Sequence, residues 1–213
     1  MRFHDRIQAG RALAERLRAY AGRSDVIVLA LPRGGVPVGY EVAAALGAPL
    51  DVFLVRKLGV PGHPELAMGA LAGNGIRILT RDIIDEMGIG DEAIEHVTAA
   101  ELAELARRER AYRGARPAPV LSNRTIILVD DGLATGATME AAVAAARQGG
   151  PARIVVAAPV GAPETCARLA SVADEVVCVE TPRSFQAVGL WYDRFEQTSD
   201  EEVVALLERG RTP

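Results

Sequence analysis

Two adjacent aspartates, Asp130 and Asp131, directly follow an apolar run of the chain and precede a loop of small residues. The loop continues through Gly132, Leu133, Ala134, Thr135, Gly136, Ala137 and Thr138. Glycine lets a backbone wrap closely around a ligand, and the start of a helix offers free N–H groups and the positive end of its dipole. We therefore expect residues 134–138 to bind a phosphate monoester.

The two carboxylates need a separate explanation, because adjacent acids at the end of a buried strand repel each other and are costly to desolvate. Hydrogen bonds from sugar hydroxyls, or a nearby Mg²⁺ ion, would stabilise them. An acid pair beside a phosphate loop therefore predicts a site for a ribose 5-phosphate. The alternative is an ordinary strand–turn–helix junction in which Asp131 only caps the helix. The segment matches neither G-x-x-x-x-G-K-[ST] nor G-x-G-x-x-G, the signatures of two other nucleotide-binding loops.

Two further segments place cations directly after apolar runs. Arg33 precedes Gly34 and Gly35, whose lack of a Cβ would let backbone N–H groups approach an anion while Arg33 adds charge-assisted bonds. Arg56 and Lys57 are adjacent cations, which repel each other unless an anion lies between them. Both segments are candidate anion sites, and the alternative for both is a solvated cation on the surface.

The stretch 56–65 is expected to be irregular, because it contains two glycines and two prolines. Glycine hinges would let such a loop close over a site and exclude water. His63 and Glu65 lie within it, and Glu65 is a candidate acid or base. The alternative is that both are exposed loop residues.

Apolar runs and capping signals predict alternating strands and helices. Strands are expected at 26–31, 50–55, 125–129, 154–160 and 175–179, with a hairpin at 67–79 that turns at 73–75. Helices are expected at 5–20, 36–46, 91–112, 138–147, 164–171 and 199–208. This alternation indicates an α/β fold with an open, mostly parallel sheet and helices on both faces. Ligands bind beyond the carboxyl ends of such strands, so the segments after Leu31, Val55 and Val129 should converge on one cleft.

Composition excludes several other classes of protein. The 213 residues suit one compact domain, and a net charge of −4 argues against non-specific binding of nucleic acid. Cys166 and Cys178 are expected to be reduced core thiols, no histidine pair has metal-ligand spacing, and no G-x-S-x-G elbow is present. Charged residues follow Met1 and no apolar run approaches the ~20 residues of a membrane helix, so we expect a cytoplasmic protein that does not bind membranes.

Residues 126–138 resemble the signature for phosphoribosyl pyrophosphate (PRPP) of the type I phosphoribosyltransferases: four apolar residues, two acids and a small-residue loop. Residues 31–35 resemble the pyrophosphate loop of that family, and residues 55–62 resemble the segment that begins the flexible catalytic loop of adenine phosphoribosyltransferases. The match spans about 26–160. It implies one domain over 1–213, with a core at about 24–180, a small hood from the chain ends at about 1–23 and 181–213, and a helical and hairpin insertion.

The resemblance also implies an activity, the transfer of ribose 5-phosphate from PRPP to a nitrogenous base with release of pyrophosphate. It implies that Asp130 and Asp131 bind the ribose hydroxyls and, indirectly through the ribose, Mg²⁺. It implies that residues 134–138 bind the 5-phosphate. It assigns pyrophosphate to Arg33, Gly34 and Gly35 at a strained peptide that can be cis, and to Arg56 and Lys57. Glu65 would complete the catalytic set.

The acceptor is the part of the reaction that the sequence defines least. Phe185, Trp191 and Tyr192 resemble the base-binding segment of hypoxanthine-guanine enzymes, where an aromatic ring could stack on a nucleobase, and core packing is the alternative. Those enzymes have an Asp where this chain has Ala134, as adenine and orotate enzymes do, which weakens the 6-oxopurine interpretation.

Other activities remain open. A regulator that senses PRPP or nucleotides without catalysis is the main alternative, and a hydrolase or phosphorylase of sugar phosphates is a third. A homodimer is expected, and the charged helix at 91–113 is either an exposed helix laced with ion pairs or a dimer contact.

Overall fold

A computed structural model of the chain describes residues 2–210, apart from the side chains of Pro64, Glu65 and Asn74. Its centre is a five-stranded sheet with the order β2-β1-β6-β7-β8, in which every neighbouring pair is parallel. The strands are β1 (Val26–Ala30), β2 (Leu50–Val52), β6 (Thr125–Val129), β7 (Arg153–Val160) and β8 (Glu175–Glu180). Every residue of β1 and β6 is buried, which explains why these strands are continuous apolar runs rather than alternating ones.

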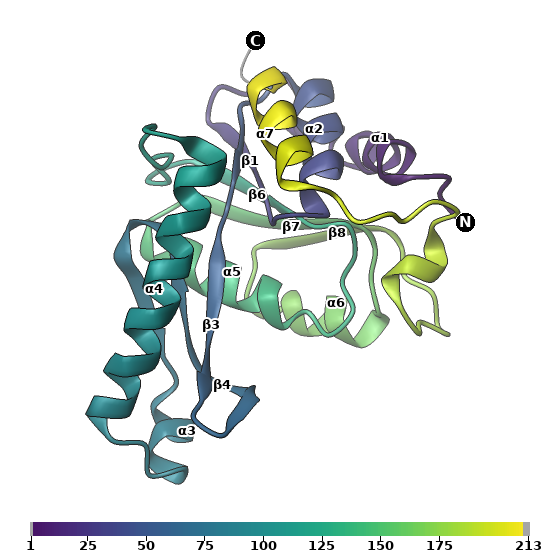
Figure 1. Cartoon of the computed structure of the whole chain (residues 1–213). Coiled ribbons are helices and arrows are strands. Elements are labelled where there is room, and N and C mark those ends of the chain that lie inside the picture. Colours follow the sequence, from purple (N-terminus) through teal and green to yellow (C-terminus); the bar gives the residue numbers. More distant parts are fainter. Residues whose placement is uncertain (1, 211–213) are drawn as a thin grey trace.

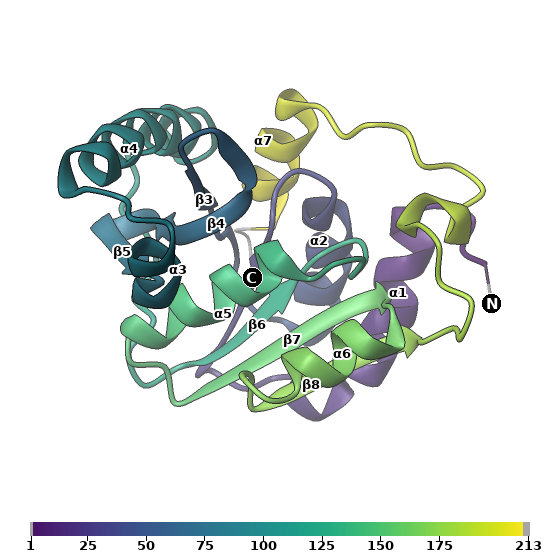
Figure 2. The same ribbon diagram turned by 90° about the horizontal axis from the view of Figure 1, so that it is seen from below.

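Helices cover both faces of this sheet (Figure 1). One face carries α1 (Arg6–Arg16), α2 (Gly35–Leu46) and α7 (Asp200–Arg209), and the other carries α5 (Ala137–Gln148) and α6 (Pro163–Leu169). Figure 2, the view from below, shows α5 and α6 in front of the sheet. The predicted α/β class, with an open parallel sheet between two helical layers, is confirmed.

A second, antiparallel sheet lies beside the first and contacts α5. It consists of β3 (Val55–Val60), β4 (His63–Ala72) and β5 (Ile76–Leu79), with the short helix η2 (Gly73–Gly75) between the last two strands. The helices α3 (Arg81–Glu86) and α4 (Asp91–Arg113) follow it in the chain. Figures 1 and 2 show this unit on one side of the main sheet, with α4 packed along β3.

Three details differ from the sequence-based expectations. The strand predicted at 50–55 ends at Val52, and β3 begins a different sheet at Val55. The stretch 56–65 is not irregular but forms a β-hairpin with a tight turn at Pro61 and Gly62, where Gly62 has φ +80°. Buried Leu58 and Val60 alternate with more exposed neighbours, a strand pattern that the glycines and prolines obscured. Helix α3 was not predicted.

Residues 3–6 pack against the segment 191–196, which precedes α7. Phe3 forms a parallel bridge with Tyr192, just after the short helix η3 (Val188–Trp191), and both side chains are buried. The helix starts predicted at residues 5 and 199 are confirmed: Asp5 accepts a hydrogen bond from the N–H of Gln8, and Ser199 accepts one from the N–H of Glu202. The short helix η1 (Arg18–Tyr20) leads from α1 to β1. Within residues 2–210, no helix combines the length and apolar character needed to cross a membrane.

Candidate active site

The acid pair lies at the carboxyl end of β6, in the middle of the parallel sheet. The N–H of Asp131 donates to Oδ1 of Asp130 at 2.8 Å. Helix α5 begins only at Ala137 with Gly136 at its N-cap, so Asp131 does not cap this helix and the alternative of a simple capping junction is excluded. The two carboxyl groups need another stabilising partner.

Arg6, in the first turn of α1, is that partner for Asp131. Its Nε and Nη2 lie 2.9 and 2.8 Å from Oδ2 of Asp131, and the side chains of Arg6 and Asp131 are only 12% and 15% exposed. The Nη1 atom of Arg6 also donates to the carbonyl oxygen of Glu196 at 2.7 Å, and the guanidinium lies 3.9 Å from the ring centroid of Phe195. Arg6 therefore joins the acid pair to the segment 195–196.

The surroundings of Asp130 and Asp131 shift the pKa values of the two acids to different extents. Burial raises the pKa of Asp130 well above its usual value, and the neighbouring charge of Asp131 adds to this effect. Burial also raises the pKa of Asp131, but the Arg6 guanidinium opposes that shift. Since only Asp131 has a direct hydrogen bond from a cation, Asp131 is the acid that more readily stays ionised and Asp130 the one that more readily holds a proton.

The small-residue loop is held from behind by α6. Oγ1 of Thr165 donates to the carbonyl oxygen of Ala134 at 2.6 Å, and the Arg168 guanidinium donates to the carbonyl oxygen of Thr135. In a trans peptide the C=O and the following N–H point in opposite directions. The N–H groups of Thr135 and Gly136 therefore point away from α6.

These N–H groups add to the free N–H groups in the first turn of α5, so the loop presents several donors on its open side. Ala134, Thr135 and Thr138 are exposed, while Gly136 and Ala137 are half-buried. Gly136 has φ +73°, and a Cβ there would lie 2.5 Å from Cγ2 of Thr165. Glycine is thus required both by the backbone conformation and by the contact with α6.

Arg33, Gly34 and Gly35 lie directly beside the acid pair. The peptide between Pro32 and Arg33 is cis, in agreement with the family resemblance. A Cβ on Gly34 would lie 2.0 Å from Oδ2 of Asp131, and a Cβ on Gly35 would lie 2.7 Å from the carbonyl oxygen of Val129. The two glycines therefore allow the start of α2 to approach the end of β6, a role in addition to the anion contact expected from the sequence.

Arg33 itself is directed toward α4 and α7. Its Nη1 lies 4.0 Å from Oδ1 of Asp200, and the hydroxyl of Tyr112 donates to the same oxygen at 2.6 Å. Burial and this bond to Asp200 raise the pKa of Tyr112 to about 12. Tyr112 therefore stays protonated at neutral pH and holds Asp200 beside Arg33.

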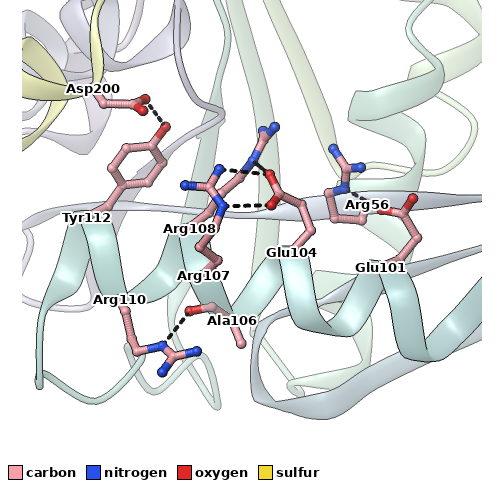
Figure 3. Close-up of polar contacts among 9 residues, drawn as sticks. All are labelled: Arg56, Glu101, Glu104, Ala106, Arg107, Arg108, Arg110, Tyr112 and Asp200. Carbon is pink, nitrogen blue, oxygen red and sulfur yellow. Dashed lines mark hydrogen bonds and ion pairs between the residues drawn. The ribbon is translucent and has the colours of Figure 1, made fainter.

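Arg56 lies on β3, and its Nε contacts Oε2 of Glu101 on α4 at 2.5 Å (Figure 3). Figure 3 also shows Glu104 between Arg107 and Arg108, and Tyr112 directed toward Asp200. Hydrogen bonds from these two arginines lower the pKa of Glu104 to about 2. Side chains of α4 thus form a row from the hairpin to Asp200, and the segments after Leu31 and Val55 are linked through this helix.

Lys57 is exposed and, because side chains alternate along a strand, lies on the opposite face of β3 from Arg56. A cavity of about 490 Å³ between the hairpin and α4 is lined by both residues, by Val97 and Glu101, and by residues 59–62. The segments after Leu31 and Val129 meet directly, as expected. The segment after Val55 belongs to a separate sheet, and its Arg56 contacts Glu101 on α4 instead of the acid pair, so the expected convergence of all three segments is shown only for the other two.

The aromatic residues of the C-terminal segment differ in exposure. Tyr192 is 2% exposed, packs between Phe3 and Phe195, and donates from its hydroxyl to the carbonyl oxygen of Asp131 at 2.6 Å. Its ring face is therefore covered, so Tyr192 supports the acid pair instead of stacking on a base, as the core-packing alternative held. Phe185 and Trp191 are half-buried. The side chain of Glu65 lies outside the described part of the chain.

The sequence interpretation did not include three residues that shape this site: Arg6, Thr165 and Arg168. Arg6 carried a weak signal as a cation directly after the cap Asp5 at the start of a helix, where an acid is the more usual residue. Thr165 and Arg168 lie in a short helix with ordinary composition. Their role depends on the packing of α6 behind the loop.

Comparisons with known proteins agree with this arrangement. The family model of the phosphoribosyl transferase domain matches residues 2–193, so the chain belongs to this family. Two curated proteins of Mycobacterium tuberculosis, provisionally named as phosphoribosyl transferases, are each 50% identical over 208 residues, which cover 98% of this chain but 47% of the relative. The chain thus spans about half the length of these relatives.

A solved structure shows the same fold over the whole chain. The crystal structure of TT1426 from Thermus thermophilus is 45% identical, covers 100% of both chains and has a TM-score of 0.89. The architecture described above is accordingly the type I phosphoribosyltransferase fold.

Proposed function

We propose that this protein binds PRPP at the carboxyl edge of its parallel sheet and transfers ribose 5-phosphate to a nitrogenous base, with release of pyrophosphate. One observation carries the proposal. The carbonyl groups of Ala134 and Thr135 are turned toward α6, which directs N–H donors to the open side of a loop that begins beside two carboxyl groups. N–H donors for a phosphate next to oxygen acceptors for hydroxyls match a ribose 5-phosphate.

Each part of PRPP has a complementary group in the proposal. Residues 134–138 bind the 5-phosphate, and Asp130 and Asp131 accept hydrogen bonds from the ribose hydroxyls. Arg33, with the backbone at Gly34 and Gly35, binds the pyrophosphate next to those acids. Arg56 and Lys57 bind the pyrophosphate from the hairpin. For this contact, the Arg56 side chain has to leave Glu101 and turn to the ligand.

The chemistry follows from these charges. As the bond to pyrophosphate breaks, positive charge develops at the anomeric carbon and negative charge on the leaving group. The ionised carboxylate of Asp131 lies on the ribose side, and the cations of Arg33, Arg56 and Lys57 lie on the leaving-group side, so both charges are stabilised in the transition state. Closure of the hairpin over the substrate would exclude water, which would otherwise compete with the acceptor.

A magnesium ion suits the donor set of this site. Mg²⁺ prefers oxygen ligands and is typically held by one or two carboxylates together with substrate phosphates. Asp130 and Asp131 are adjacent acids with oxygen donors, and Asp131 already has a cation partner in Arg6, so contact through the ribose fits better than a cage of protein ligands. When bound with pyrophosphate, the ion would neutralise charge on the leaving group.

The acceptor in the proposal is a nucleobase or a similar ring. Phe185 and Trp191 are half-buried and belong to the segment that packs against the acid pair through Tyr192. Either ring could stack on a base there. No acid stands at position 134, so an acceptor that needs a carboxylate in the loop fits less well.

Two measurements test the proposal. Calorimetric titration with PRPP and Mg²⁺ should show binding, and ribose 5-phosphate or pyrophosphate alone should bind more weakly. Release of pyrophosphate should then be measured across a panel of purine, pyrimidine and other heterocyclic bases. Absence of PRPP binding at millimolar concentration would overturn the proposal as a whole.

A second candidate function is a PRPP-sensing regulator without turnover. The observation that favours it is that two of the proposed site residues already have ionic partners, Arg56 in Glu101 and Asp131 in Arg6. Binding of PRPP without pyrophosphate release on any base in the panel would select this candidate over the transferase.

A further inference from the structure

The two cysteines of the chain meet behind the phosphate loop. Cys166 lies on α6 and Cys178 on the edge strand β8, both half-buried, and their Sγ atoms are 3.2 Å apart. A Cβ on Gly161 would lie 2.5 Å from Sγ of Cys166 and 3.2 Å from Sγ of Cys178. The thiols therefore occupy space that exists only because residue 161 has no side chain.

We propose that Cys166 and Cys178 form a reversible oxidation site, in which a low-molecular-weight disulfide such as oxidised glutathione converts the two thiols to an intramolecular disulfide. The S–S bond is about 2.05 Å long, so the two sulfur atoms need to approach by roughly 1.2 Å from the distance in the reduced protein. A change of a side-chain torsion and a small shift of α6 supply a movement of this size.

The exchange proceeds in two balanced steps. The Cys166 thiolate attacks one sulfur of oxidised glutathione, the glutathione S–S bond breaks, and one glutathione leaves as a thiolate that takes up a proton. The Cys178 thiol then loses its proton and attacks Sγ of Cys166, and the second glutathione leaves. Two protein thiols are oxidised, and one oxidised glutathione is reduced to two thiols.

The surroundings of the two thiols make Cys166, rather than Cys178, the thiol that attacks first. The hydrogen bond with Cys178 lowers the pKa of Cys166, while the same contact, together with burial, raises the pKa of Cys178. Cys166 also lies on a helix with exposed residues at Ala167 and Arg168, so an oxidant reaches it from solvent. Cys178 then acts as the resolving thiol.

Oxidation would affect the neighbouring loop, because α6 holds it. Thr165, adjacent to Cys166, donates to Ala134, and Arg168 on the same helix donates to Thr135. Movement of α6 toward β8 weakens these bonds. This consequence rests on the proposed function: the oxidised protein should bind PRPP about tenfold more weakly, on the scale of one hydrogen bond.

The test is a redox titration of the whole chain in glutathione buffers of stepped ratio, quenched by alkylation and read by intact mass. We expect both thiols to disappear together, with a mass lower by two hydrogens, monomeric protein on non-reducing gels, and full recovery with dithiothreitol. Cys178→Ser, which has no resolving thiol, should instead accumulate a glutathione adduct on Cys166, and Cys166→Ser should react slowly.

Two outcomes overturn the proposal: complete alkylation of both thiols even in fully oxidised glutathione, or oxidation only to disulfides between molecules. The effect on the loop is judged separately by PRPP titration of the oxidised and reduced protein. Equal affinities would overturn the coupling to the loop and leave the oxidation site standing. Failure of both forms to bind PRPP would instead count against the proposed function.

Discussion

The loop after β6 and the hairpin β3–β4 both carry charged residues expected at the site, but they are built differently. The first is one continuous segment from a buried strand through two acids and a small-residue loop into α5. The second belongs to a separate antiparallel sheet, and Arg56 is paired with Glu101 on α4, which follows much later in the chain. Chemistry contained in one segment is visible in a sequence, whereas chemistry that depends on a distant partner is not.

The acid pair itself contains both cases. Its position at the end of the central strand follows from local sequence, but the cation that stabilises Asp131 comes from Arg6 near the other end of the chain. From the sequence alone, the repulsion between the two acids predicts that Asp131→Asn leaves stability equal or higher. The ion pair with Arg6 reverses that expectation for Asp131 and leaves it in force for Asp130.

The largest expected effect is that of Asp131→Asn on turnover. Loss of the ionised carboxylate removes a contact to the developing charge of the transition state, so kcat should fall by ~10² or more. The same change leaves Arg6 without its anionic partner, and stability should fall by about 1–3 kcal/mol, less than for a fully buried pair. Steady-state kinetics and urea unfolding on the same preparation measure both effects.

The matched variant is Arg6→Met, which removes the cation and keeps Asp131. Its loss of stability should not add to that of Asp131→Asn in the double variant, because both break the same contact. Fully additive losses would show that the ion pair contributes nothing in solution.

The next effect concerns Gly136, where Gly136→Ala should weaken PRPP binding by up to about a hundredfold. The new Cβ meets Thr165 and the residue is held at φ +73°, so the loop must move. Gly22→Ala is a matched control, because Gly22 has φ +71° but open space around it. The control should lose only about 1–2 kcal/mol of stability, the cost of placing an alanine in the left-handed region, and should bind PRPP normally. Equal PRPP affinity in both variants would remove the loop from the site.

A smaller effect is expected for the hairpin. Arg56→Ala should lower kcat/KM by roughly tenfold, because one charge-assisted bond to pyrophosphate is lost. Glu101→Gln removes the negative charge that pairs with Arg56. Because the Arg56 cation is then free to bind the ligand, KM for PRPP should fall. An unchanged KM in Glu101→Gln together with normal activity in Arg56→Ala would place Arg56 outside the mechanism.

The smallest effect is a difference in pH dependence. A carboxyl group whose pKa is raised on folding binds its proton more tightly in the folded state, so its contribution is most favourable at low pH and stability falls as pH rises toward the raised pKa. Burial places Asp130 in this class. Asp130→Asn should therefore be as stable as the wild type or more so at neutral pH, and its stability should fall less between acidic and neutral pH. Unfolding curves from pH 4 to 8 measure the difference, and parallel curves would contradict it.

The regular part of the fold was readable because each element has a strong local signal. Four of the five strands of the parallel sheet, β1, β6, β7 and β8, contain apolar runs, and the caps Asp5 and Ser199 mark α1 and α7. The hairpin β3–β4 was missed because its two glycines and two prolines are typical of loops, although Leu58 and Val60 alternate as in a strand. Helix α3 is too short for its periodicity to be recognised.

The same distinction explains which residues of the site could be predicted from the sequence and which could not. The acids, the phosphate loop and Arg33 with its two glycines are brought together as the sequence predicted, because adjacent parallel strands end at the same edge. Arg6, Thr165 and Arg168 depend on how α1 and α6 pack, which no local pattern encodes. Tyr192 was recognised as part of the site, but only the packing shows that its ring is covered and its hydroxyl holds Asp131.

The bridge between Phe3 and Tyr192 has a consequence for the order of folding. Backbone hydrogen bonds join Phe3 to Trp191 and Asp193, and Arg6 lies only three positions further along the chain. These contacts are among the most distant in sequence that the molecule makes, so the loop they close costs the most chain entropy. Arg6 emerges from the ribosome long before Glu196, so its contact with that residue, and with it the final arrangement of the acid pair, must await the synthesis of residues 191–196.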